Sequence, residues 1–206
     1  MAGLRERKKL QTRAAIVQAA VDLFAQHGFE AVTVDDIALA ANVSRQTVFN
    51  YFSSKEQMLF DRDEEVEAAL LAAVRDRANG VSLVDAFRAH TRAFWIRFDE
   101  ILGKGPVPHG FWEIVEPSPA LRDYLEASFA RHARTIARQL ATERELLEDD
   151  PVCHALARAL CGVNAAILTC GLHRLIASDD PHNTITAMLD QAGRAYDLLE
   201  HGFGGT

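Results

Sequence analysis

Helix start and stop signals recur along almost the whole chain, and they constrain the fold more than any other feature. Ser, Thr or Asp precedes stretches of helical period, and Gly, Asn or Pro follows them. The first stretch runs from about Leu4 to His27, carries Ile16 and Phe24 on one stripe, and stops at Gly28. About nine helices are expected in this way, and no segment favours a strand over a helix. The chain of 206 residues is therefore predicted to be all-α.

The overall composition is that of a soluble globular protein. Hydrophobic residues make up 49% of the chain and charged residues 25%. Three cysteines without a CxxC pair indicate reduced thiols in a cytosolic protein. The most apolar segment, residues 159–172, is shorter than the about 20 residues that a membrane span needs. No apolar run follows the basic N-terminus, so we expect a cytoplasmic protein with neither a secretory signal nor a membrane partner.

Charge is divided unevenly along the chain, whose formal net charge is −7. Residues 1–60 carry seven Lys or Arg against six Asp or Glu, and the remainder carries fifteen against twenty-three. The first thirteen residues carry five basic residues and one acidic residue. An acidic protein can therefore still have a basic end that binds a polyanion.

A helix-turn-helix is predicted between residues 33 and 52. Thr33 and Asp36 have the spacing of a capping box, so a short helix is expected over about residues 34–41. Asn42 suits the left-handed conformation that ends a helix sharply, and Ser44 is placed to cap a second short helix that ends near Phe52. Two short helices joined by such a turn form the DNA-binding unit in which the second helix enters the major groove.

The start of that second helix carries side chains suited to base recognition. Arg45 can donate two hydrogen bonds to guanine, and Gln46 or Asn50 can bond the edge of adenine. Val48 and Phe52 are expected to be core residues. Taken singly, Arg45 and Lys55 would more often be solvated surface charges, and it is their joint spacing that favours DNA binding.

The stretch "TVDDIALAANVSRQTVFNYFSSKEQML" resembles the DNA-binding domain of the TetR family of bacterial repressors. The segment "TVFNYFSSKE" matches the family signature closely, and the resemblance covers about residues 8–60. It implies that Arg45, Gln46 and Asn50 contact bases, and that Thr33, Thr47, Tyr51 and Lys55 contact phosphates. The full set of DNA-binding residues predicted in this way is Thr33, Ser44, Arg45, Gln46, Thr47, Phe49, Asn50, Tyr51 and Lys55.

Two residues depart from what the family's DNA contacts suggest. Phe49 stands where the family usually has Tyr, so a hydroxyl is missing and only a ring contact to DNA remains. Asp35 is an acid near the expected DNA backbone and would repel phosphate unless it points away. The basic run Arg5–Lys9 is either a solvated tail or an arm, within residues 1–13, that reaches the DNA.

Two domains are expected, a DNA-binding domain over residues 1–60 and an effector-binding and dimerisation domain over residues 61–206. A fourth helix, capped by Ser53 or Ser54 with Glu56 at capping-box distance from Ser53, is expected to run unbroken to about Asn79. The boundary near residue 60 would then lie within that helix. No internal repeat is present.

The second domain carries an aromatic-rich set of residues. Most such stripes are simply core, but the resemblance implies that they enclose a pocket for a small apolar or amphipathic effector. The candidate pocket residues are Phe87, Thr91, Phe94, Trp95, Phe98, His109, Phe111, Trp112, Tyr124, Phe129 and Asn164.

The expected helix from about Pro151 to Ala177 is apolar all round and rich in small residues, so it must be buried on every side. The resemblance implies that this helix and the last one form a homodimer interface. Candidates for core or interface are Leu156, Leu160, Val163, Ile167, Met188, Leu189, Ala192, Tyr196 and Leu199.

These features predict a ligand-responsive transcriptional regulator, a repressor that binds a palindromic double-stranded operator as a dimer and is released by an inducer. An activator or a ligand-independent DNA-binding regulator is the alternative within this class. An all-α small-molecule-binding protein or enzyme is the alternative from a different class. The scattered histidines have no metal spacing and no Glu-x-x-His occurs, so no enzyme activity, metal or cofactor is expected.

Overall fold

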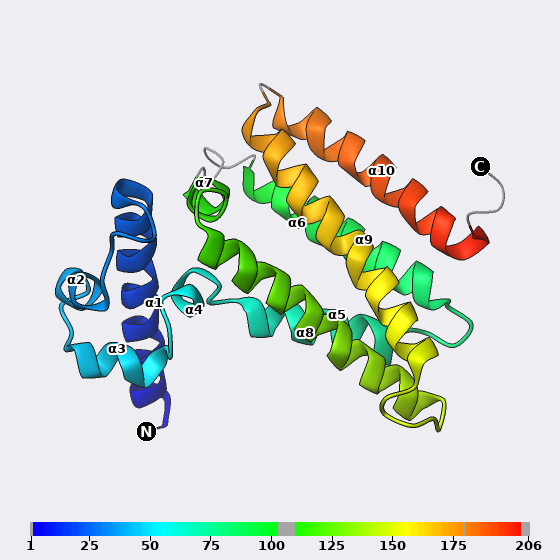
Figure 1. Cartoon of the computed structure of the whole chain (residues 1–206), viewed down its shortest axis with the longest axis horizontal. Helices are drawn as coiled ribbons and strands as arrows, with labels where there is room; N and C mark the ends of the chain where they lie inside the picture. The colour runs from blue at the N-terminus through cyan, green and yellow to red at the C-terminus, as the bar shows by residue number, and fades with distance from the viewer. Residues whose placement is uncertain (1, 103–109, 179, 203–206) are drawn as a thin grey trace. The chain divides into compact units, whose positions relative to one another are not determined.

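The computed structural model describes residues 2–102, 110–178 and 180–202. These residues form ten α-helices and contain no β-strand, which confirms the all-α prediction (Figure 1). The chain divides into two compact units. The first comprises Met1–Asp63 and Pro108–Leu125, and the second comprises Glu64–Val107 and Glu126–Thr206. Residues 110–125 thus group with the N-terminal residues, although the sequence analysis places them in the second domain.

The first unit is built on α1 (Ala2–His27), which packs against α2 (Val34–Ala40), α4 (Glu56–Leu59) and α7 (Gly110–Val115). The predicted stripe of α1 faces the core, where Ile16 is fully buried and Phe24 is 1% exposed. α3 (Arg45–Tyr51) packs on α2. Val115 of α7 is also fully buried, which explains why this short helix belongs to the N-terminal unit.

The helix signals around the helix-turn-helix act as predicted. The Thr33 hydroxyl accepts a hydrogen bond from the Asp36 N–H at 3.2 Å, and the Asp36 carboxylate accepts from the Thr33 N–H at 2.9 Å. Asn42 has a φ of 54°, in the left-handed region that turns the chain out of α2. The Ser44 hydroxyl accepts from the Thr47 N–H at 3.0 Å, which starts α3.

The prediction of one unbroken fourth helix is wrong. The structure contains the short α4 and then α5 (Asp63–Arg75), separated by the turn at residues 60–62. The Phe60 ring stacks on Tyr124 at 4.9 Å between centroids and lies edge-on to Phe111 at 5.5 Å. Asp61 forms an ion pair with Arg13 at 2.6 Å. These contacts hold residues 60–61 to the first unit, and the helix is interrupted there.

The cap of α4 also differs from the one expected. Gln57, rather than Glu56, reaches back to Ser53, whose N–H and hydroxyl donate to the Gln57 amide oxygen at 2.8 and 3.0 Å. Gln57, four residues after Ser53, therefore accepts the hydrogen bond that was expected to go to Glu56, three residues after it.

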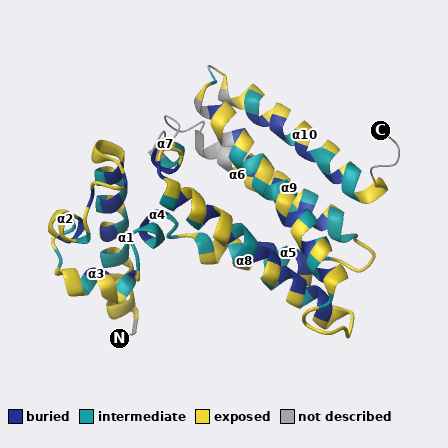
Figure 2. Ribbon diagram, viewed as in Figure 1, coloured by how far each residue is buried: buried dark blue, intermediate teal, exposed yellow. Residues whose placement is uncertain are grey.

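The second unit surrounds one main apolar core. It contains α5, α6 (Leu83–Leu102), most of α8 (Pro119–Glu143), α9 (Pro151–Ile176) and α10 (Pro181–His201). α10 packs along both α6 and α9. Phe87, Leu140 and Tyr196 are fully buried in this core, and Trp95 with Met188 belongs to a second, smaller cluster (Figure 2).

α9 is apolar along its length but only partly covered within the chain. By length and composition it is the one helix of the described residues that reaches the size of a membrane span, yet only 24% of its most apolar window is buried. Core and interface helices of soluble proteins have the same composition. Its exposed side carries small residues at helical spacing, namely Ala155, Gly162, Ala166 and Cys170.

Candidate functional site

The polar face of α3 is exposed because two apolar residues fix its other side. Val48 is fully buried and Phe52 is 2% exposed, so both belong to the core of the first unit, as predicted. The remaining side chains of the helix therefore point outward, and four of them are classed as exposed: Arg45, Gln46, Phe49 and Asn50.

Arg45 is held by both of the residues that depart from the expected DNA contacts. Its guanidinium donates to the Asp35 carboxylate at 2.9 Å, across from α3 to α2. It also lies over the Phe49 ring, 5.5 Å from the centroid. The Arg45 and Asp35 side chains are 60% and 63% exposed, so the ion pair itself contributes at most about 1 kcal/mol to folding. Its effect is to orient the guanidinium.

The other expected base contacts pair with each other. The Gln46 amide donates to the Asn50 amide oxygen at 3.2 Å, one turn along α3. At the start of the helix, the hydroxyls of Ser44 and Thr47 lie 2.8 Å apart. The side chains expected to contact DNA thus form small hydrogen-bonded sets on one exposed surface, which limits their rotamers before any ligand arrives.

Thr33 and Tyr51, two expected phosphate contacts, lie in different surroundings. Thr33 is exposed and its hydroxyl donates to the Asp36 carboxylate at 2.6 Å, inside the capping box. These hydrogen bonds hold the pKa of the Asp36 carboxyl below its ordinary value. Tyr51 is half-buried at the end of α3.

Lys55 is engaged within the domain rather than extended into solvent. Its ammonium donates to the backbone carbonyls of Phe29 and Val32 at 2.9 and 2.8 Å. It also lies 4.3 Å from the centroid of the Phe29 ring. Two of its three N–H donors therefore satisfy carbonyls of the connection between α1 and α2. The contact fixes that connection, an arrangement that the sequence does not predict.

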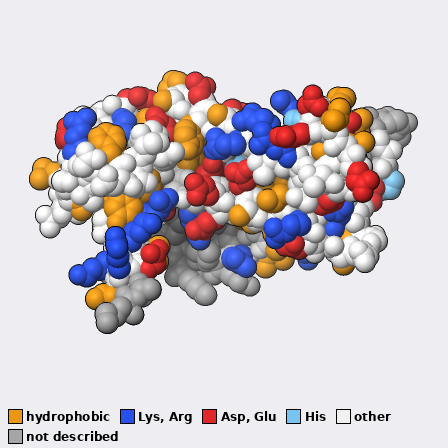
Figure 3. Space-filling view, turned by 90° about the horizontal axis from the view of Figure 1, so that it is seen from below, with side chains coloured by type: hydrophobic (Ala, Val, Ile, Leu, Met, Phe, Trp, Pro, Cys, Tyr) orange, Lys and Arg blue, Asp and Glu red, His pale blue; other side chains and the backbone are white. Residues whose placement is uncertain are grey.

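The basic N-terminal run is part of a helix. Residues from Ala2 onward belong to α1, and Arg5, Arg7, Lys8 and Lys9 are all exposed. Figure 3 shows Lys and Arg side chains in a row near this end of the first unit. The run is thus a basic extension of α1.

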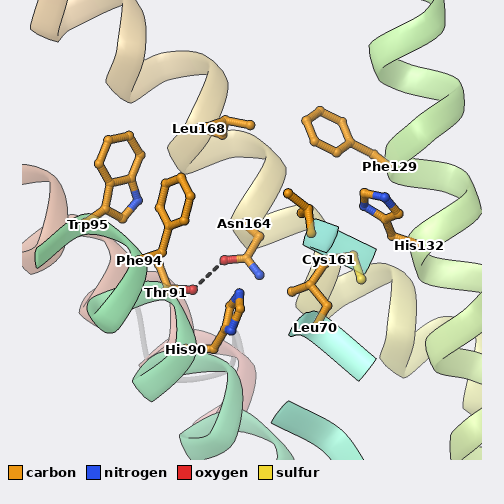
Figure 4. Close-up of a pocket in the computed structure, with 11 residues that line it drawn as sticks. Leu70, His90, Thr91, Phe94, Trp95, Phe129, His132, Cys161, Asn164 and Leu168 are labelled. Carbon is orange, nitrogen blue, oxygen red and sulfur yellow. Dashed lines mark hydrogen bonds between the residues drawn. The ribbon is translucent and has the colours of Figure 1, made fainter. Parts of the chain in front are cut away.

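A mostly apolar cavity lies within the second unit, between four helices (Figure 4). Its volume is about 80 Å³, which is smaller than a usual small-molecule site, so a ligand must displace lining side chains to enter it. The lining residues are Val66 and Leu70 of α5, His90, Thr91, Phe94 and Trp95 of α6, Phe129 and His132 of α8, and Cys161, Asn164 and Leu168 of α9.

The polar side chains at one end of the cavity form a buried cluster. The hydroxyls of Thr91 and Tyr196 both donate to the amide oxygen of Asn164, the second at 3.1 Å, and they lie 2.8 Å from each other. Burial raises the pKa of Tyr196 and of Cys161 to about 12, and it lowers the pKa of His90. Tyr196, Cys161 and His90 are therefore neutral near pH 7.

Five of the predicted pocket residues line this cavity, namely Thr91, Phe94, Trp95, Phe129 and Asn164. Phe87 is instead fully buried in the main core. Phe111, Trp112 and Tyr124 belong to the first unit, where two of these rings contact Phe60. The side chain of Phe98 and the whole of His109 lie outside the described residues.

Six lining residues are absent from the prediction, and most of them lie one turn from a predicted residue. His90 precedes Phe94 by four positions, His132 follows Phe129 by three, and Cys161 and Leu168 flank Asn164. Helical spacing from the predicted residues could therefore have identified these four lining residues. Val66 and Leu70 lie on α5, in a segment that the prediction did not assign to the pocket.

The predicted interface residues separate into core and partly covered positions. Leu160, Met188, Ala192 and Tyr196 are at most 3% exposed, so they are core residues of the chain. The others are partly buried and pack against the two clusters: Leu156, Val163, Ile167, Leu189 and Leu199.

An exposed polar recognition helix with a basic extension on one unit, and an apolar cavity on the other, define a helix-turn-helix regulator. Residues 16–61 match the family of bacterial regulatory proteins named tetR. The transcriptional regulator TcmR of Streptomyces glaucescens is 33% identical over 152 residues, which are 72% of this chain and 67% of TcmR. The chain belongs to the TetR family of bacterial transcriptional regulators. It is accordingly a regulator and not an enzyme.

Two solved structures share the fold along almost the whole chain. A TetR-family regulator from Syntrophomonas wolfei superposes with a TM-score of 0.61 over 96% of this chain and 99% of its own, at 17% identity. FadR of Thermus thermophilus, a TetR-family repressor solved in complex with lauroyl-CoA, gives a TM-score of 0.51 at 27% identity, over 93% of this chain and 94% of its own.

Proposed function

We propose that the chain is a cytoplasmic repressor that binds a palindromic operator through the exposed face of α3 and releases it when an effector binds. The single observation that carries this proposal is the polar surface of α3, held outward by buried Val48 and Phe52. A second helix presented in this way enters the major groove in helix-turn-helix proteins.

The side chains of that surface divide into two roles. Arg45 suits guanine, and Gln46 and Asn50 suit adenine, because each can offer two hydrogen-bonding atoms to a base edge. Hydroxyl groups of Ser, Thr and Tyr bind phosphates and set the position of the helix on the duplex. We assign the phosphate role to Thr33, Ser44, Thr47 and Tyr51.

Asp35 and Phe49 act through Arg45 in this proposal. The Asp35 carboxylate accepts a hydrogen bond at one edge of the guanidinium, and the Phe49 ring lies against its face, so fewer rotamers of Arg45 must be lost on binding. The Asp35 carboxylate therefore faces Arg45, which explains how an acid can lie near the DNA backbone. It also gives Phe49 a function without a hydroxyl.

Lys55 has a structural role in this proposal, in addition to the phosphate contact that the family resemblance implies. Its two bonds to the carbonyls of Phe29 and Val32 fix the connection before α2. One N–H of the ammonium is left for a phosphate. We therefore expect Lys55 to affect the binding of all DNA sequences alike, and not the recognition of any particular base.

A homodimer follows from the exposed side of α9. Small residues there permit close approach of a second helix, and covering them removes apolar surface from water. Two copies related by a two-fold axis match a palindromic site. We place the interface on the exposed faces of α9 and α10, with Ala155, Gly162, Ala166 and Cys170 at its centre.

Regulation is assigned to the cavity of the second unit. An effector that binds one dimer arrangement more tightly than the other shifts the population toward it by that difference in affinity alone. FadR, which is related in fold and sequence, binds lauroyl-CoA. The apolar lining of the cavity supports an apolar or amphipathic effector here as well.

Binding of the chain's own promoter DNA at several salt concentrations tests the function. Affinity should fall steeply with salt, because each phosphate contact releases counterions. Arg45→Ala should weaken specific binding by about 1–3 kcal/mol and relax sequence preference. Unchanged affinity in this variant would remove Arg45 from the interface.

A further inference from the structure

The cavity of the second unit contains a hydrogen-bond donor that has no partner. The amide nitrogen of Asn164 is buried and bonds no other protein atom. The amide oxygen of the same side chain is engaged, since Thr91 and Tyr196 both donate to it. Two hydroxyl donors on the oxygen fix the orientation of the amide, and the nitrogen therefore points the opposite way. Figure 4 shows it turned from Thr91 into the space between the lining side chains.

A buried donor without a partner lowers the stability of the folded protein, and a ligand that accepts a hydrogen bond from it can restore that stability. Such groups are rare in folded proteins, and each requires an explanation. An oxygen that accepts from this nitrogen would restore the missing hydrogen bond. Solvent does not reach the nitrogen, so an acceptor can approach it only if neighbouring side chains move.

The charge of the lining limits the ligand further. No Lys, Arg, Asp or Glu is among the residues that line the cavity. Burial lowers the pKa of His90 and raises the pKa of the Cys161 thiol, so neither side chain offers a charge near pH 7. A carboxylate or ammonium group would lose its hydration without gaining a Lys, Arg, Asp or Glu partner. Phe94, Trp95 and Phe129 supply ring surface for the rest of the ligand.

We propose that this cavity binds an uncharged, largely apolar molecule bearing a carbonyl-type oxygen, and that the Asn164 amide nitrogen donates to that oxygen. The proposal rests on the proposed function in taking the cavity as the regulatory site, and it names the chemical class of the effector.

Three two-ring compounds of matched size test the proposal by calorimetry on the full chain. They are 2-acetylnaphthalene, its hydrocarbon analogue 2-isopropylnaphthalene, and the anion 2-naphthoate. We expect the ketone to bind about tenfold more tightly than the hydrocarbon, the effect of about one good hydrogen bond. The anion should bind most weakly. Equal affinity of ketone and hydrocarbon, tightest binding of 2-naphthoate, or no binding of any of the three would overturn the proposal.

Asn164→Leu identifies the donor. The substitution keeps the size of the side chain, removes the amide, and leaves the hydroxyls of Thr91 and Tyr196 to bond each other at 2.8 Å. The preference for the ketone should disappear while the hydrocarbon binds as before. Gln139→Leu, which makes the same chemical change on α8 away from the cavity, should retain the preference. If Asn164→Leu keeps it too, Asn164 is not the donor. Should that variant fail to fold, the ranking of the three compounds on the native chain still decides the question.

Binding of promoter DNA by the same preparation separates this inference from the proposed function. Normal DNA binding with no preference for the ketone refutes only the assignment of the effector. Absence of DNA binding together with the expected ranking refutes the regulator and leaves the ligand chemistry standing.

Discussion

The Arg45 guanidinium of α3 donates to the Asp35 carboxylate of α2 at 2.9 Å, so the side chain best suited to recognise guanine is held by an acid of the neighbouring helix. The ring of Phe49 lies on the same guanidinium. Asp36, the next residue along α2, is occupied by Thr33, which leaves Asp35 as the carboxylate that faces Arg45.

Removing the Asp35 charge should change selectivity more than affinity. In Asp35→Asn the guanidinium loses its charged partner and samples more rotamers, so preference at one base pair in each half-site should fall about tenfold. Affinity for random DNA should rise slightly, because an acid near the phosphates is gone. The measurement is a set of titrations with single-base variants of the operator.

Asp22→Asn is the matched control for that substitution. It removes the same charge from an exposed position of α1, where Asp22 bonds only Gln18 among the hydrogen bonds found. It should leave base preference unchanged. If Asp35→Asn behaves as the control does, the ion pair has no role in recognition.

Lys55→Met should weaken binding to all DNA sequences alike and also destabilise the first unit. The substitution keeps the apolar stem but leaves the carbonyls of Phe29 and Val32 without their donor, at a cost of about 1–2 kcal/mol in unfolding free energy. Urea unfolding and DNA titration measure the two effects. A loss of DNA affinity with unchanged stability would mean that Lys55 acts mainly on phosphate.

The capping box of α2 predicts a pH dependence of stability with a definite sign. The folded pKa of Asp36 is lowered by its bonds to Thr33, from an ordinary value of 3.8. Its contribution is therefore complete above that value and is lost as pH falls through the lower, folded pKa. Asp36→Asn should be less stable than the native chain at pH 7, and the difference should shrink below pH 3.8.

Thermal unfolding of both chains at pH 7 and at about pH 3 measures this difference. Asp22→Asn serves again as the control, because no capping box depends on Asp22. A difference between the native chain and Asp36→Asn that is the same at both pH values would contradict the role of the ionised carboxylate.

A charge on the exposed side of α9 should prevent dimerisation without unfolding the chain. Ala166 is exposed within the chain, so Ala166→Glu should fold normally and sediment as a monomer at micromolar concentration. Ala127→Glu places the same charge on the exposed side of α8 and should remain dimeric. A dimeric Ala166→Glu would move the interface away from this face of α9.

The sequence predicts those parts of the fold that depend on local chemistry. Caps at Thr33 and Ser44, the left-handed Asn42 and the buried pair Val48 and Phe52 each follow from residues within one or two turns. The exposed face of α3 follows from them, because fixing one side of a helix fixes the other.

What the sequence does not predict are contacts between residues far apart in the chain. The bonds from Lys55 to Phe29 and Val32 and the stacking of Phe60 on Tyr124 depend on how helices cross, and periodicity does not contain this information. For the same reason, helix periodicity predicts which aromatic residues share a helix face but not which of them surround one cavity.

Selection of binding sites from a random DNA pool by the native chain tests the central claim most directly. The account predicts enrichment of an inverted repeat whose half-sites contain a guanine that is no longer selected by Arg45→Ala. Recovery of no preferred sequence, or of the same inverted repeat with Arg45→Ala, would contradict it.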